Sequence, residues 1–169
     1  MDKEKKILGK TADPFLISSR KENCDTLLDM LRQAHQDLVI FSHNLDGPLY
    51  DTSEFTDTVR KLSLDNKNSK VRILIQELDF LIKHGHRIVE LARRLPTSIE
   101  IRHANSRFEH VNTCYSIVDH KGVILRNDAY RFDAKADYHD PRLALELTKQ
   151  FDEMWEQSEP STEMHRLHI

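Results

Sequence analysis

The stretch Leu38-Val39-Ile40-Phe41-Ser42-His43-Asn44-Leu45-Asp46 decides the fold of this chain. Residues 38–41 form its longest strictly apolar run, and a continuous apolar run of this length is typical of a strand that is buried on both faces. Ligands gather where loops leave the carboxyl ends of parallel strands. The stretch therefore predicts a central strand over 38–41 and a candidate functional loop over 42–46.

Helical and strand patterns alternate on both sides of this strand. A capping box at Ser19–Glu22 predicts a helix over 20–35, and Asp51 with Glu54 predicts the cap of a second helix. We expect further helices over 79–95 and after Asp140-Pro141. Strands are predicted at 15–17, 71–75, 99–102, 115–118 and 123–125, the last two as a β-hairpin. The order predicts an α/β/α sandwich with a mixed, mostly parallel sheet.

The length and composition indicate one domain. The chain has 169 residues, 38% of them apolar and 31% charged, with a net charge of −3. We expect the domain to span residues 13–158, with 1–12 and 159–169 as loose or extended termini. No apolar run approaches the roughly 18 residues of a membrane span, and the charged start shows no secretory signal. These features predict a soluble, cytoplasmic protein without a membrane partner.

The cysteines and glycines exclude several kinds of chemistry. Cys24 and Cys114 provide neither a disulfide framework nor a zinc spacing, and we expect both to be small buried groups. The four glycines are scattered, so no P-loop or Rossmann phosphate loop is present. The sequence therefore predicts no cofactor.

Polar side chains follow three of the predicted strands. The loops at 42–46, 76–79 and 102–103 leave the same edge of the sheet, so we expect a pocket that contains His43, Asp46, Gln76 and Glu77. The alternative is that these residues cap helices and bind water.

A second polar cluster is His84-Gly85-His86-Arg87, followed by Glu90. His86 and Glu90 lie one helical turn apart and could share a metal ion, but no third ligand completes a zinc pattern. A solvated helix face explains the cluster better, so we predict no metal site.

The segment around Asn112–Asp119 resembles one half of a phospholipase D-like domain. In that superfamily the strand before the hairpin carries His-x-Lys-x4-Asp, and a Gly-Ser-x-Asn run follows. Here Tyr115–Asp119 matches the end of that motif, and Phe151-Asp-Glu-Met-Trp155 matches the last helix of the family. The resemblance implies the phospholipase D fold and a phosphohistidine mechanism.

The catalytic letters of the family are incomplete in this sequence. One register puts Asn112 at the nucleophile, Cys114 at the lysine and Asp119 at the aspartate; the other starts at His110 and puts Ile117 at the aspartate. Arg126-Asn-Asp-Ala stands in place of Gly-Ser-x-Asn. An asparagine amide cannot be the nucleophile, and each lost oxyanion-type donor costs roughly 3–4 kcal/mol of transition-state stabilisation. This pattern argues against phosphodiesterase activity by the usual route.

Nearly the whole chain from Asp13 on resembles an uncharacterised proteobacterial domain that is commonly appended to GNAT-type acetyltransferases. The matching stretches are 42–51, 85–95, 151–155 and 166–169. The resemblance implies a bacterial protein with a GNAT-type acetyltransferase as a partner. It also implies a homodimer with contacts at the hairpin and the Trp155 helix.

We weigh three functions. The first is a non-catalytic binding or interaction module with an anion-friendly pocket, in which Arg87 and Arg126 hold a phosphate or carboxylate. The candidate residues of this module are His43, Asp46, Gln76, His86, Arg87, His110, Asp119 and Arg126. Its alternative gives Asp119 to the hairpin turn and Arg126 to a surface ion pair. The second function is a phosphodiesterase or nuclease with His110 or His43 as a rearranged nucleophile.

The third function is nucleic-acid binding along the helix that carries Arg87, Arg93 and Arg94. These arginines alternate with Glu90 and stand near a helix C-terminus, where cations are favoured in any case. We therefore expect no nucleic-acid partner.

Overall fold

The protein is built on one central β-sheet, and the computed structural model describes residues 4–160 of the chain. The sheet has eight strands in the order β1-β7-β6-β5-β2-β3-β4-β8. Their bounds are β1 Phe15–Ile17, β2 Asp37–Ser42, β3 Lys70–Ile75, β4 Ile99–His103, β5 Cys114–Val118, β6 Gly122–Arg126, β7 Ala134–Asp137 and β8 Glu159–Pro160.

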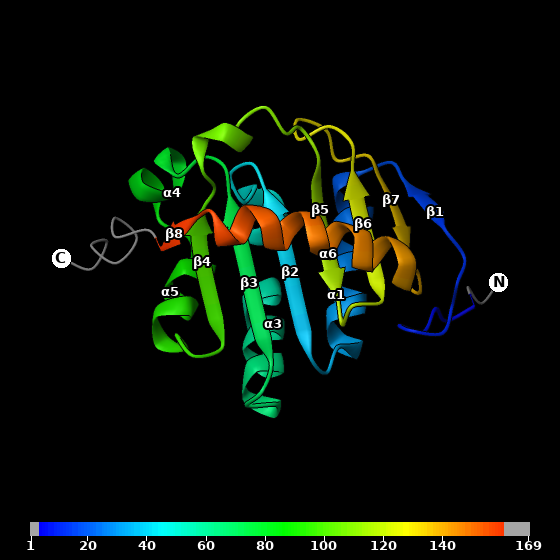
Figure 1. The fold of residues 1–169 in the computed structure, drawn as a ribbon. Helices are drawn as coiled ribbons and strands as arrows, with labels where there is room; N and C mark the ends of the chain where they lie inside the picture. The colour runs from blue at the N-terminus through cyan, green and yellow to red at the C-terminus, as the bar shows by residue number, and fades with distance from the viewer. Residues whose placement is uncertain (1–3, 161–169) are drawn as a thin grey trace.

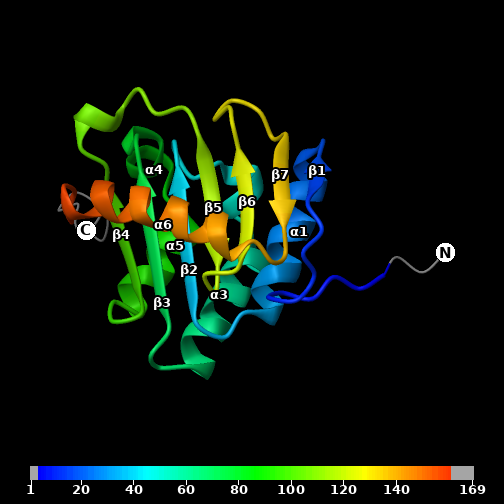
Figure 2. The ribbon, with the colours of Figure 1, turned by 45° about the vertical axis from the view of Figure 1, so that its right-hand side comes forward.

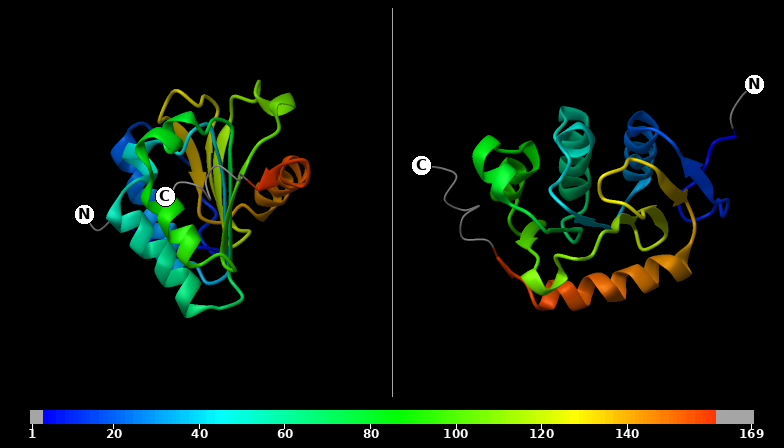
Figure 3. Two further views of the ribbon diagram at one scale, coloured as in Figure 1. Left: turned by 90° about the vertical axis from the view of Figure 1, so that its left-hand side faces the viewer. Right: turned by 90° about the horizontal axis from the view of Figure 1, so that it is seen from above.

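Helices cover both faces of this sheet. The last helix, α6, runs across one face and the other helices lie on the opposite face, so the molecule has three layers (Figures 1 and 3). The helices are α1 Arg20–Gln33, α2 Gly47–Tyr50, α3 Ser53–Asp65, α4 Asp79–His84, α5 Arg87–Arg94 and α6 Pro141–Glu156, with a 3-10 turn at Ser106–Phe108. The α/β/α sandwich predicted from the sequence is confirmed.

Strand β2 is buried on both faces, as its apolar run predicts. Leu38 and Ile40 belong to the apolar cluster under α1, α3 and α5. Val39 and Phe41 belong to the cluster under α6. Alternate side chains of one strand thus supply both cores, since successive residues of a strand point to opposite faces.

The sheet is mixed, but it is not mostly parallel. Only β2–β3 and β3–β4 pair in parallel. The other pairs, from β1 through β7, β6 and β5 to β2 and between β4 and β8, are antiparallel. The prediction of a mostly parallel sheet was wrong because β5 pairs antiparallel with β2, and because neither β8 nor β7, whose sequence Ala-Lys-Ala-Asp has little strand character, was expected.

The helix starts follow local capping. Ser19 and Asp140 accept hydrogen bonds from the amides of Glu22 and Leu143, so both predicted caps are confirmed. The predicted cap of α3 at Asp51 was wrong by one residue. Thr52 accepts the bond from the amide of Phe55 at 3.1 Å.

The predicted helix 79–95 is two helices. Gly85 ends α4 with a φ of +71°, a left-handed conformation that glycine adopts without a steric penalty. His86 then caps α5 through its side chain. The apolar spacing continues through the break, which is why the periodicity alone did not reveal it.

The segment before β1 packs against the sheet and α1. The amide of Leu8 donates to Oε1 of Gln33, and Gln33 Nε2 donates to the carbonyl of Lys6. The amide of Gly9 donates to the carbonyl of Tyr138. The polar composition of residues 4–12 did not indicate these contacts. Within residues 4–160, every helix is too short or too polar to traverse a lipid bilayer.

Candidate functional site

The ends of β2, β3 and β4 bring several predicted polar residues together. His43 Nε2 lies 3.1 Å from Glu77 Oε2, and the amides of Gln76 and Glu77 donate to the carbonyl of His43. His103 Nε2 lies 3.0 Å from the carbonyl of Gln76. These loops leave one edge of the sheet, the upper one in Figure 2. We call the residues 42–46, 76–77 and 103, which follow β2, β3 and β4 at this edge, the strand-end site.

Gln76 connects the strand-end site to the turn before β5. Its Nε2 donates to the carbonyls of Phe108 and Val111 at 3.0 and 2.7 Å. These two bonds fix the orientation of the amide, so its Oε1 faces away from the turn. The exposed His110 lies within the same turn.

Arg126 joins the loop after β6 to the loop after β2. Its Nη1 donates to Asp46 at 2.7 Å, while Nε and Nη2 donate to the carbonyls of Arg131 and Ala129. Arg126 is 3% exposed and Asp46 is 21% exposed, so this ion pair is buried and not on the surface. Burial opposes the charge of the guanidinium, but Asp46 dominates and raises the pKa of Arg126 above its usual value. Because of these three hydrogen bonds, each nitrogen of the Arg126 guanidinium is engaged inside the protein.

The residue at the nucleophile position of the first register, Asn112, stabilises the same loop. Its Nδ2 donates to Asp128, and its carbonyl accepts from the amide of Ala129. The amide of Tyr130 donates to Asp128 Oδ1 at 2.9 Å. The ring of Tyr130 then lies 5.7 Å from the ring of His43.

Cys114, at the lysine position of that register, is a buried thiol. Burial raises its pKa, although the Arg126 guanidinium opposes this shift. A neutral thiol in this position supplies no positive charge to a phosphate. The expectation of a small buried group is confirmed for Cys114, whereas Cys24 is only partly buried.

Asp119 lies at the opposite edge of the sheet, where β5 ends and β2 begins. Its carboxylate accepts from the amides of His35, Gln36 and Asp37 at 2.8, 2.8 and 3.0 Å. Ile117, the aspartate position of the other register, is buried in the cluster under α6. Asp119 thus holds the hairpin turn and the start of β2, away from the strand-end site.

His86 is buried, so its expected place on a solvated helix face was wrong. Its Nδ1 accepts from the amide of Ile88 at 3.1 Å, which puts the ring proton on Nε2, and Nε2 donates to the carbonyl of Leu45 at 3.3 Å. Both ring nitrogens are therefore engaged, and His86 does not share a metal with Glu90. Through Leu45, His86 supports the loop that carries His43 and Asp46.

Arg87 pairs with Asp51 beside His86. Its amide and its Nη1 lie 3.0 and 3.3 Å from Asp51 Oδ1. Burial would raise the pKa of Asp51, but the Arg87 amide, His86 and the Arg87 guanidinium lower it. Arg87 therefore braces the start of α5 instead of presenting its donors to the strand-end site.

We expect the neutral state of His86 to make stability depend on pH. Burial lowers the pKa of His86, with Arg87 acting in the same direction and Asp51 and the Leu45 carbonyl opposing. As pH falls below the ordinary histidine value of about 6.5, the unfolded chain takes up this proton first, so the folded state loses stability. His86→Asn keeps a capping oxygen but cannot titrate.

The measurement is urea unfolding of the native protein and His86→Asn between pH 8 and pH 5. The stability advantage of the native protein should be largest at pH 8 and shrink toward pH 5. An advantage that is independent of pH would show that His86 is not the titrating group.

A groove lies away from these residues. A cavity of about 630 Å³ opens between α1 and α3, and residues such as His35, Lys61 and Asp65 line it. None of the eight candidate residues does. Among residues 4–160, no group of three or more His, Cys, Asp or Glu side chains could hold a metal ion.

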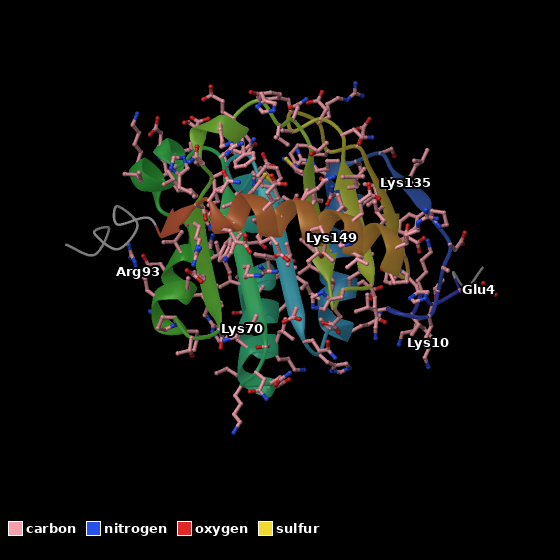
Figure 4. All side chains as sticks on the ribbon, in the orientation of Figure 1. Glu4, Lys10, Lys70, Arg93, Lys135 and Lys149 are labelled. Atoms are coloured by element: carbon pink, nitrogen blue, oxygen red, sulfur yellow. The ribbon has the colours of Figure 1, made fainter. Side chains whose placement is uncertain are left out.

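The sequence did not single out Tyr130 or Asn44. Tyr130 lies in a polar loop that carries no motif. Asn44 lies between His43 and Asp46, whose ionisable side chains are the stronger signals for a site. The exposed lysines labelled in Figure 4 form no patch, because Lys10, Lys70 and Lys135 lie toward the edges of the view and Lys149 lies on α6 across its front. Lys70 stands where β3 begins, at the end of the strand away from the strand-end site.

One known family of domains matches most of the chain. A family model with the description "Domain of unknown function (DUF7931)" matches residues 19–167. No curated protein matches the sequence. Arg166–Ile169, one of the stretches that carry the resemblance to the acetyltransferase-appended domain, lies outside the described residues.

Several solved structures share the architecture. Nuc from Salmonella typhimurium, a phospholipase D family member, has a TM-score of 0.61 at 16% identity, over 88% of this chain and 99% of that one. NucT from Helicobacter pylori has a TM-score of 0.62 at 14% identity, over 88% and 99%. TrmBL2, an archaeal chromatin protein, has a TM-score of 0.62 at 17% identity. The match covers 88% of this chain but only 54% of the TrmBL2 chain. These likenesses show a phospholipase D-like fold.

Proposed function

Because this chain belongs to the family described as Domain of unknown function (DUF7931), we propose a function from the site itself. The protein is a phospholipase D-like binding module that does not hydrolyse phosphodiesters through a phosphohistidine. Ligand recognition takes place at the strand-end site.

The observation that carries this proposal is the environment of Asn112, Cys114 and Asp119. The register that starts at Asn112 has an aspartate, Asp119, at its last position, where the other register has the buried Ile117. In that register the nucleophile position holds an amide that stabilises a loop, and the lysine position holds a buried thiol. The amide of Asn112 cannot attack phosphorus, and the thiol of Cys114, which burial keeps protonated, brings no positive charge to the phosphate oxygens.

The ligand was expected to be an anion held by Arg87 and Arg126. In the structure both guanidinium groups bind carboxylates, and an anion at Arg126 would have to displace Asp46, whereas Arg87 is 57% exposed and engages Asp51 through Nη1. A phosphate complex at Arg126 therefore requires rearrangement of its ion pair with Asp46.

We further propose that the module acts in the cytoplasm with a GNAT-type acetyltransferase and as a homodimer. The support is the sequence resemblance alone. Trp155 is 8% exposed and stacks on Phe151, so contacts from the last helix would come from its outer side chains.

One observation favours the alternative, a phosphodiesterase or nuclease. Glu77 orients the imidazole of His43 at a distance of 3.1 Å, an arrangement that suits a general base or a nucleophile. His110 is exposed, and no carboxylate holds it within the described residues. His43 is thus the better-placed candidate for residual chemistry.

Hydrolysis of bis(4-nitrophenyl) phosphate and of single-stranded DNA decides between the two functions. The binding module predicts no turnover above that of the matched His43→Ala and His110→Ala proteins, with or without added divalent metals. Turnover that one of these substitutions abolishes would replace the module with the enzyme.

A further inference from the structure

The strand-end site is rich in hydrogen-bond acceptors. The buried oxygens Gln76 Oε1 and Asn44 Oδ1 have no hydrogen-bond partner within residues 4–160. Glu77 follows Gln76 in the sequence, and its amide donates to the carbonyl of His43, the neighbour of Asn44. The carboxylate of Glu77 is 51% exposed. Both oxygens are closed off from solvent, and without a donor each adds partial negative charge near this edge, which favours a cation nearby.

The cationic side chains around this edge are already engaged. Arg126 donates to Asp46 and two carbonyls, Arg131 lies 3.0 Å from Asp133, and Arg107 donates to Gln157. They neutralise acidic groups or bind carbonyls inside the protein. The carboxylate of Glu77 is 51% exposed and lies beside the imidazole of His43.

An exposed aromatic ring stands next to these acceptors. Tyr130 is 79% exposed, yet its loop is held firmly by Arg126, Asp128 and Asn112. The ring lies 5.7 Å from that of His43, whose Nε2 contacts Glu77. A fixed aromatic face beside a carboxylate is an arrangement that attracts organic cations.

We propose that the strand-end site binds an ammonium or guanidinium group. Glu77 supplies the charge, the unsatisfied oxygens of Gln76 and Asn44 add negative potential from inside the protein, and Tyr130 covers the cation with its ring. This inference rests on the proposed binding function and specifies its ligand. The group belongs either to a small amine or to a lysine or arginine side chain of a peptide.

Backbone amide NMR of the full chain tests the proposal. The probes are butylammonium, agmatine, the peptides Gly-Lys-Gly and Gly-Arg-Gly, and inorganic phosphate, all at one ionic strength. A cation should shift the amides of residues 43–46, 76–77 and 130 with saturation, whereas phosphate should not. Tighter binding of the peptides than of the free amines identifies a protein side chain as the source, and the reverse order identifies a small amine.

Exposed residues allow variants that leave the fold intact. Glu77→Gln should weaken cation binding by about fivefold and Tyr130→Leu by about threefold. Glu146→Gln on the exposed side of α6 removes an equal charge elsewhere and should leave binding unchanged.

Three results would overturn the inference: no saturable shift with any cation, an equal loss in Glu146→Gln, or saturation of the same amides by phosphate. Phosphate binding without turnover would leave the binding module in place. Phosphodiester turnover would instead contradict the proposed function, whatever the cation titrations show.

Discussion

Replacing Arg126 with methionine should destabilise the protein by about 3 kcal/mol. This is the largest effect that we expect from one substitution around the strand-end site. The change leaves Asp46 and the carbonyls of Ala129 and Arg131 without their donor. Asp46 is 21% exposed and can recover some hydration, which keeps the loss at the lower end of the range for broken buried pairs. Urea denaturation of the full chain measures the free energy of unfolding.

Arg131→Met is the matched control for this prediction. Arg131 pairs with Asp133 in solvent, where an ion pair contributes at most about 1 kcal/mol. The Arg126 variant should also lose the fixed position of Tyr130, which NMR contacts between Tyr130 and His43 report. Equal stability of the two variants would mean that Arg126 does not hold the loop.

Asp119→Asn should destabilise the protein by about 2–3 kcal/mol without changing ligand binding. Charge-assisted bonds from the amides of His35, Gln36 and Asp37 are lost or weakened, because a neutral amide accepts less strongly and brings an N–H toward those donors. Asparagine tolerates the φ of +53° at this position, so backbone strain adds little.

His120→Asn is the control beside it. His120 is an exposed partner of Asp37 at 2.6 Å, and its loss should cost less than about 1 kcal/mol. If Asp119→Asn instead abolished cation shifts at residues 43–46 and left stability intact, Asp119 would belong to the binding site after all.

The sequence predicted the parts of the fold that depend on local patterns. The apolar run at 38–41, the hairpin around Asp119 and the caps at Ser19 and Asp140 each have a short-range physical cause. The break at Gly85 and strand β7 depend on tertiary packing, and the sequence periodicity does not report them.

The sequence predicted which loops meet at the strand ends, but not the ion pairs around them. Strand ends indicated where His43, Gln76 and Glu77 would meet. The partners of Arg126 and Arg87 come from other loops, at sequence separations of 80 and 36 residues. Local sequence spacing does not reveal an ion pair between residues so far apart. The sequence alone therefore assigns both arginines to an anionic ligand.

The ³¹P NMR spectrum of the full chain with excess bis(4-nitrophenyl) phosphate tests the central claim most directly, because it detects released product and phosphorylated protein together. We expect only the resonance of the starting diester over several hours. A product or phosphohistidine resonance that disappears in His43→Ala would contradict the account.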